Sequence, residues 1–189
     1  MITSLFCVAL AYLLGSISST CVIGYLVGHV DMRSEPDGKI SGAAVYRRLG
    51  LFPFVCVGLM DIGLVILAVT IARVLTHSPN IIMLAGFAGV MGHNWSIFLG
   101  LRGGLGATAI FGALVAVIPL QVSYGLIGGG IVWLLTGRPS VGTAVGILIT
   151  SGLTLLQAGM GALAMYPLML FSLMLLKQLQ VARVTRTIH

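Results

Sequence analysis

The segment from Gly92 to Thr108, GHNWSIFLGLRGGLGAT, combines the residue types that bind phosphate. Arg102 is followed by three closely spaced glycines, and a new apolar helix is expected to begin near Ala107. Glycine lets backbone N–H groups turn toward an anion, and a helix N-terminus adds unpaired N–H donors. A guanidinium can bind two phosphate oxygens at once. The segment therefore predicts a phosphate site, and a tight turn that merely needs glycine is an equally open alternative. It is not a nucleotide-binding P-loop, because Leu105 occupies the position of the required lysine.

Two ionisable residues lie within apolar stretches, where such groups are costly. His93 lies a little over two helical turns before the glycines, and Asn94 is beside it. Asp61 is the one acid inside an apolar stretch, so it needs a partner, a proton or water. For His93 we weigh a functional role against a hydrogen bond to a neighbouring helix. For Asp61 we favour a structural link to a basic group or to hydroxyls on neighbouring helices.

The remaining basic residues form small clusters near the ends of the apolar stretches. Arg47 and Arg48 precede the second stretch, Arg138 is close to Ser140, and Lys177 is close to Arg183. The alternative is that these basic residues serve only to orient the chain in the membrane, which requires basic residues at such positions. The sequence contains no HExxH motif and no paired carboxylates for acid–base catalysis. These observations favour transfer from an already activated donor, with catalysis by positioning and charge neutralisation.

The composition requires that these groups be held by membrane helices. Only 7% of the 189 residues are charged, 58% are hydrophobic, and there are 26 glycines. Such a chain cannot supply the charged surface of a water-soluble protein, and this excludes a soluble nucleic-acid binder. The three cysteines have no metal-ligand spacing, and we expect neither a metal nor a cofactor. We predict a single all-α polytopic membrane domain over residues 1–189, with about seven spans near 2–28, 51–76, 80–101, 107–120, 121–136, 140–156 and 158–176.

The basic residues predict the orientation of the chain in the membrane. An outside N-terminus and a cytoplasmic C-terminus place nine of the ten Lys and Arg residues inside, and Arg73 is the exception. The long polar segment of about 29–50 and the glycine-rich loop of about 101–106 then face the cytoplasm. The fourth and fifth stretches are short and could form a re-entrant pair. Glycines at four-residue spacing, such as Gly125/Gly129 and Gly142/Gly146, predict close helix packing.

Three stretches resemble the bacterial acyl-phosphate:glycerol-3-phosphate acyltransferases. They are YLLGSI from Tyr12, the segment from Gly92 to Thr108, which resembles GHxFPxFLxFKGGKGVAT, and TGRPSVGT from Thr136. The resemblance implies seven spans, a cytoplasmic active site, and acyl transfer from acyl phosphate to glycerol 3-phosphate to give lysophosphatidic acid in a bacterial inner membrane. It implies membrane lipid as a partner and says nothing of oligomeric state. It implies catalytic roles for Arg47, Ser140, Lys177 and Gln180, and substrate or phosphate binding by His93, Arg102, Gly103, Gly104, Gly106, Thr108, Arg138 and Arg183.

Several positions depart from the family pattern. Asp37 and Lys39 replace a serine and an asparagine of the first loop, and Leu105 replaces the second lysine of the glycine-rich loop. Lys177 and Gln180 stand where the family has histidine and asparagine. Each lost charge-assisted phosphate contact would cost about 1.5–3 kcal/mol. The alternative hypothesis is therefore a catalytically inactive family member that serves as a lipid- or anion-binding membrane scaffold.

Overall fold

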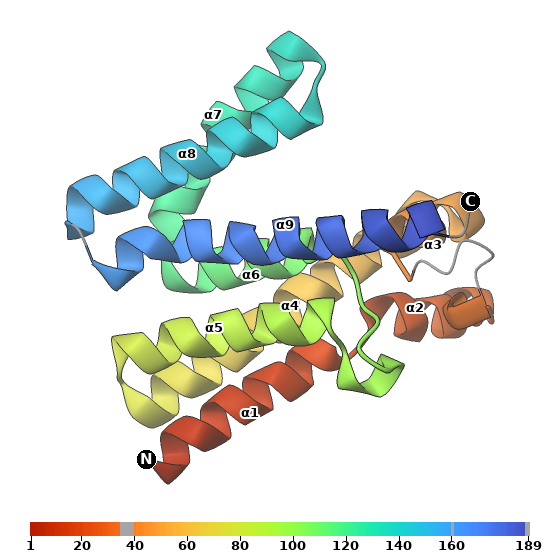
Figure 1. The fold of residues 1–189 in the computed structure, drawn as a ribbon, viewed down its shortest axis with the longest axis horizontal. Coiled ribbons are helices and arrows are strands. Elements are labelled where there is room, and N and C mark those ends of the chain that lie inside the picture. The colour runs from red at the N-terminus through yellow and green to blue at the C-terminus, as the bar shows by residue number, and fades with distance from the viewer. Residues whose placement is uncertain (35–39, 160, 188–189) are drawn as a thin grey trace.

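The computed structural model describes residues 1–34, 40–159 and 161–187, and the elements in these ranges are helices joined by turns (Figure 1). Asp37 and Lys39 lie outside the described residues. Two 3₁₀ turns, Met32–Ser34 and Ile97–Leu99, accompany the α-helices. The α-helices are α1 (Ile2–Ser16), α2 (Ser19–Gly28), α3 (Gly42–Leu49), α4 (Leu51–Thr76), α5 (Pro79–Asn94), α6 (Ala107–Val117), α7 (Pro119–Thr136), α8 (Pro139–Ala158) and α9 (Ala162–Thr187).

Four of the described helices are long and apolar enough to cross a membrane by length and composition. They are α4, α5 with the turn that follows it, α7, and α9 as far as Arg183. The predicted first span is a bent pair, because α1 and α2 meet at an angle of 40°, and this pair would make a fifth span. The stretch predicted as 107–120 contains α6, which has only 11 residues. At 1.5 Å per residue α6 is roughly half the thickness of the hydrocarbon core.

The glycines let helices approach one another at backbone contact. A Cβ on Gly92 of α5 would lie 2.1 Å from the carbonyl oxygen of Tyr12 in α1. In the α7–α8 pair, a Cβ on Gly129 would lie 2.5 Å from the carbonyl oxygen of Gly142, and one on Gly125 would lie 2.6 Å from that of Gly146. The prediction of close packing at these pairs is confirmed. Side chains larger than hydrogen would force these helices apart.

The main hydrophobic core lies among α4, α5, α6 and α9. Val65, Val90, Ala113 and Leu170 are completely or almost completely buried there, together with Tyr166. Helices α7 and α8 pack on each other and lean away from this core toward the turn that joins them (Figure 1). The packed core helices hold in place the loop that joins the end of α5 to the start of α6.

Arg73, the basic residue that the predicted orientation leaves outside, contacts the end of α6. Its guanidinium donates a hydrogen bond to the carbonyl oxygen of Ala116, next to the last residue of that helix. The final carbonyl groups of a helix lack intrahelical partners and carry partial negative charge, so a cation is favourable there. This contact accounts for Arg73 independently of membrane orientation.

Candidate active site

The glycine-rich loop folds back onto the end of α5. The backbone N–H of Gly104 donates to the carbonyl oxygen of His93 at 3.1 Å. A Cβ on Gly103 would lie 2.1 Å from that same oxygen, and a Cβ on Gly104 would lie 2.3 Å from Nε2 of His93. Gly106 takes a left-handed φ of +84° as the N-cap of α6, which begins at Ala107 as predicted. The glycines are therefore needed for close approach to α5 and for the turn into α6.

A buried ionic and hydrogen-bonded cluster lies beneath this loop. Oδ1 of Asp61 is 3.4 Å from Nδ1 of His93, and Oδ2 accepts a hydrogen bond of 2.7 Å from the Thr108 hydroxyl. The first contact is longer than a well-formed hydrogen bond and becomes an ion pair when the imidazole is protonated. Asp61 is 6% exposed. We predicted that Asp61 links to a basic group or to hydroxyls on neighbouring helices, and the structure shows one contact of each kind.

Asn94 is enclosed by the same loop. It is 0% exposed, and its amide oxygen would be 2.2 Å from a Cβ on Gly106. Within the described part of the chain, neither polar atom of this amide has a hydrogen-bond partner. A buried amide without partners is unusual, so the loop encloses polar groups that are free to pair with a ligand or water.

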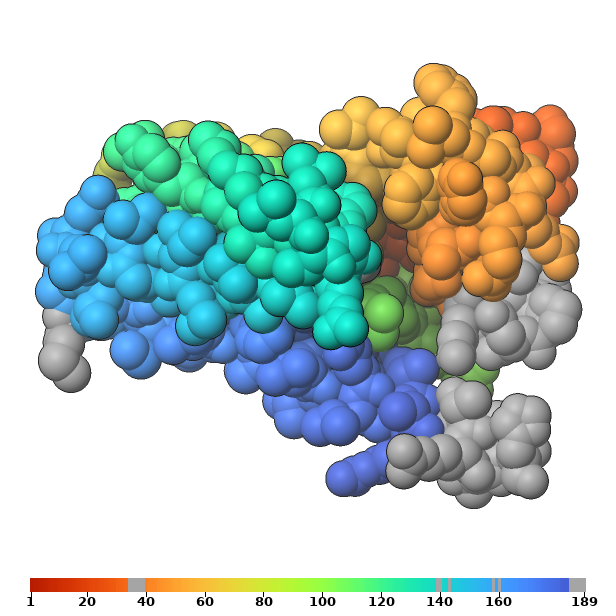
Figure 2. Space-filling view, turned by 90° about the horizontal axis from the view of Figure 1, so that it is seen from above, coloured from red at the N-terminus to blue at the C-terminus, as the bar shows by residue number. Residues whose placement is uncertain are grey.

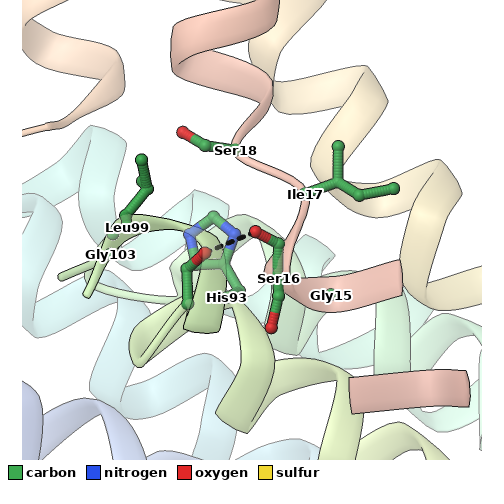
Figure 3. Close-up of a pocket in the computed structure, with 9 residues that line it drawn as sticks. Gly15, Ser16, Ile17, Ser18, His93, Leu99 and Gly103 are labelled. Atoms are coloured by element: carbon green, nitrogen blue, oxygen red, sulfur yellow. Dashed lines mark hydrogen bonds between the residues drawn. The ribbon is translucent and has the colours of Figure 1, made fainter. Parts of the chain in front are cut away.

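The break between α1 and α2 forms the opposite wall of a small pocket (Figure 3). Ser16 and Ser18 lie on the break, and Figure 3 shows the His93 imidazole between them and Gly103. The Ser96 hydroxyl donates to the carbonyl oxygen of Ser16 at 2.6 Å, which joins this break to the segment after α5. The pocket is lined by Gly15, Ser16, Ile17, Ser18, His93, Ser96, Leu99, Gly103 and Gly104.

Helix α9 brings Lys177 and Gln180 to Trp95, which follows α5 directly. The Gln180 side-chain oxygen accepts a hydrogen bond of 3.0 Å from the indole N–H, and Nζ of Lys177 lies 5.4 Å from the ring centroid. Lys177 is only 4% exposed, so its cation lies over the aromatic face at a buried position. The Tyr12 hydroxyl donates to the carbonyl oxygen of Trp95 at 2.7 Å. Lys177 and Gln180, both predicted to be catalytic, thus contact Trp95, which directly follows the helix that supports the glycine-rich loop.

The remaining predicted residues lie on other elements. Arg102 is exposed at the start of the glycine-rich loop, Arg47 is exposed on α3, and Arg183 is exposed on α9. Arg138 is the exposed N-cap of α8, and Ser140 is the second residue of that helix, with a side chain outside the described part. Figure 2 shows the α7–α8 turn, α3 and the end of α9 around one hollow, and Figure 1 shows the turn standing off from α9. The structure thus brings His93, Gly103, Gly104, Gly106 and Thr108 together, and leaves Arg138 on a separate hairpin.

Sequence reasoning did not identify several polar residues at this site. Trp95 and the serines at positions 16, 18 and 96 were not proposed, although Ser96 and Trp95 lie inside the segment singled out. Ser16 belongs to the first of the matching stretches, Ser18 follows that stretch by one residue, and Trp95 and Ser96 lie close to His93 along the chain. Within the described ranges, no group of three or more His, Cys, Asp or Glu side chains is placed to hold a metal ion.

Comparison with known proteins identifies the family of this chain. A model of the glycerol-3-phosphate acyltransferase family matches residues 5–187. Glycerol-3-phosphate acyltransferases of Shouchella clausii and Halalkalibacterium halodurans are each 36% identical to it, over 62% and 75% of this chain. These matches span 59% and 69% of the lengths of the two relatives.

Solved structures agree with the sequence relatives. The crystal structure of PlsY, an integral membrane glycerol 3-phosphate acyltransferase, in its glycerol 3-phosphate form aligns with a TM-score of 0.78 at 27% identity. That alignment covers 97% of this chain and 92% of PlsY. Its lysophosphatidic acid form gives the same TM-score at 26% identity. The all-helical fold, the length of the family match and these structures together show that this chain is an integral membrane protein belonging to the glycerol-3-phosphate acyltransferase family.

Proposed function

We propose that this chain transfers a fatty acyl group from acyl phosphate to glycerol 3-phosphate, giving lysophosphatidic acid for phospholipid synthesis. Membership of the family supports the activity, and the PlsY structures contain glycerol 3-phosphate and lysophosphatidic acid. The structural observation that supports it most is the glycine-rich loop held against His93, with Arg102 at its start and the N-terminus of α6 at its end. This arrangement would place N–H donors and a cation close to one bound anion.

The reaction needs little acid–base help from the protein. A hydroxyl oxygen of glycerol 3-phosphate attacks the acyl carbonyl carbon, the bond from that carbon to the bridging oxygen breaks, and inorganic phosphate leaves. The hydroxyl proton passes to a phosphate oxygen of the substrates. Arg102 and the amides of Gly103 and Gly106 would neutralise the phosphate on which charge develops. The Gly104 N–H already donates to His93 and would hold the loop in place. Arg47, Arg138, Ser140 and Arg183 would complete the site around the acceptor.

Lys177 and Gln180 place a cation and an amide where the family has histidine and asparagine. Lys177 places a cation beside Trp95, and Gln180 places an amide there. The cation is held against an aromatic ring, where it is partly shielded from water and acts strongly on nearby anions. These contacts support catalysis with altered residues and weigh against the inactive-scaffold alternative.

We also propose seven membrane crossings in a bacterial inner membrane, with an outside N-terminus and cytoplasmic loops of about 29–50 and 101–106. The distribution of basic residues supports this orientation. The α6 helix and the apolar part of α8, Ala144–Gln157, would supply the two shortest crossings. Acyl phosphate would then reach the pocket from the cytoplasmic leaflet.

A labelling experiment tests the orientation. In a variant whose cysteines 7, 21 and 56 are alanine, Ser78→Cys in the turn between α4 and α5 should react with a membrane-impermeant maleimide in intact spheroplasts. Ser34→Cys should react only after the membrane is broken. The reverse pattern would invert the topology and place the glycine-rich loop outside.

Complementation tests the activity itself. This chain should restore growth to a bacterial host that lacks its own acyl-phosphate:glycerol-3-phosphate acyltransferase. Failure to restore growth, with the protein present in the membrane at the level of an active family member, would favour the scaffold alternative.

A further inference from the structure

We propose that Asp61 is a positioning residue for the glycine-rich loop, acting through His93 at one end of the loop and Thr108 at the other. The inference rests on the proposed phosphate-binding role of that loop. Asp61 itself lies on α4, outside the segment that forms the loop, and it touches neither the loop glycines nor Arg102 in the described contacts.

The carboxylate contacts both sides of the loop with different oxygens. Oδ1 faces Nδ1 of His93 on α5 at 3.4 Å, and Oδ2 accepts from the Thr108 hydroxyl in the first turn of α6 at 2.7 Å. His93 precedes the loop and Thr108 follows it. The Asp61 carboxylate on α4 therefore sets the distance between the end of α5 and the start of α6, which carry the two ends of the loop.

The His93 ring transmits this position to the loop backbone. The backbone carbonyl oxygen of His93 accepts a hydrogen bond from the Gly104 N–H. Nε2 of the ring lies so close under Gly104 that a Cβ added to this glycine would be 2.3 Å from it. Rotation of the ring toward Gly104 would push the loop outward, because no space separates them. The ring has Nδ1 toward Asp61 and Nε2 toward Gly104, so the Asp61 contact holds it in place under the loop.

Packing alone does not explain a carboxylate at this position. Asp61 is 6% exposed within a span, and Ser19 at the start of α2 lies beside it at 1% exposure. Burying a carboxylate is costly unless it is paired, and apolar side chains of similar volume usually pack as well or better. The group instead joins α4, α5 and α6 below the loop. This arrangement suits a role in setting loop geometry.

The test separates loop positioning from general stability. Asp61→Asn keeps the shape and one acceptor, whereas Asp61→Ala removes both contacts. We expect kcat/KM to fall about tenfold in the first and about a hundredfold in the second, mainly through a higher KM for a phosphate-bearing substrate. Thr108→Val should lower kcat/KM in the same way, whereas Thr108→Ser, which keeps the hydroxyl, should retain the kcat/KM of the unaltered protein. His93→Asn, which can replace the Nδ1 donor, should retain more activity than His93→Gln.

Thr154→Val supplies the matched control, because the Thr154 hydroxyl also makes a buried hydrogen bond in a helix, to the carbonyl oxygen of Thr150 on α8. It should lower the melting temperature in detergent without changing KM. If Asp61→Asn and Thr108→Val change only the melting temperature, as Thr154→Val does, Asp61 has no positioning role. Arg102→Ala reports on the loop independently. If Arg102→Ala loses activity while Asp61→Asn and Thr108→Val have normal KM values, this inference is overturned and the proposed function is left intact.

Discussion

Gly103→Ala is expected to lower kcat/KM by at least about a hundredfold while the protein still folds. The added Cβ would lie 2.1 Å from the carbonyl oxygen of His93 and 2.8 Å from that of Asn94. Both are backbone atoms at the end of α5, so no side-chain rotation relieves the clash. The loop must lift from α5, which would displace the N–H groups proposed to bind phosphate. Misplacement by about 1 Å at a reacting centre can cost a factor of this size.

Steady-state acyl transfer at varied concentrations of both substrates measures this effect. Gly152→Ala is the control, because that helical glycine on α8 has no atom within 4 Å of the added Cβ. It should keep the activity of the unaltered protein. Normal kinetics in Gly103→Ala would mean that the loop adapts freely and does not bind phosphate through its backbone geometry.

Gly92→Ala should produce the second large effect, a loss of stability rather than of a single contact. Its Cβ would lie 2.1 Å from the carbonyl oxygen of Tyr12 and 2.9 Å from the backbone N of Ser16. Overpacking typically costs about 1–3 kcal/mol, and a backbone clash between two helices belongs at the upper end of that range. The melting temperature in detergent should fall by several degrees. Because α1 and α5 carry the pocket walls, activity should fall as well.

Gly63→Ala provides the comparison for stability, since its Cβ would meet no atom within 4 Å on α4. It should melt at the temperature of the unaltered protein or slightly above it, because alanine favours helix. Gly15→Ala should behave like Gly92→Ala, as its Cβ would lie 2.0 Å from the carbonyl oxygen of Gly89. Equal melting temperatures for Gly92→Ala and Gly63→Ala would show that α1 and α5 do not pack at backbone contact.

The helical class and most helix ends could be predicted from the sequence because they depend on local composition. Long apolar stretches, the glycine after α7 and the start of α6 at Ala107 are signals of this kind. The bend at Ile17 and Ser18 was not predicted, although Ser18 caps α2 locally by accepting from the Cys21 N–H. The contact of the Ser96 hydroxyl with the Ser16 carbonyl joins residues 80 positions apart, and a single sequence does not show such a contact. The division of residues 107–136 into two helices was predicted and is confirmed, but hydropathy alone does not show how deep the short α6 lies in the membrane.

The site was predictable in part for the same reason. The glycine-rich loop is contiguous in sequence, so its residues could be named together, and His93 belongs to the same segment. Asp61 could be recognised as needing partners, but a single sequence does not show that those partners are His93 and Thr108 on two other helices. The contacts of Lys177 and Gln180 with Trp95 are equally remote along the chain.

The most direct test of the account measures acyl transfer by the purified protein in lipid, with palmitoyl phosphate and glycerol 3-phosphate as substrates. The unaltered protein should form lysophosphatidic acid, and Arg102→Ala should lose most of this activity because the loop loses its cation while its glycines remain. Product formed equally well by Arg102→Ala would remove the glycine-rich loop from the phosphate site. No product from the folded, unaltered protein, in an assay where another family member is active, would contradict the proposed reaction.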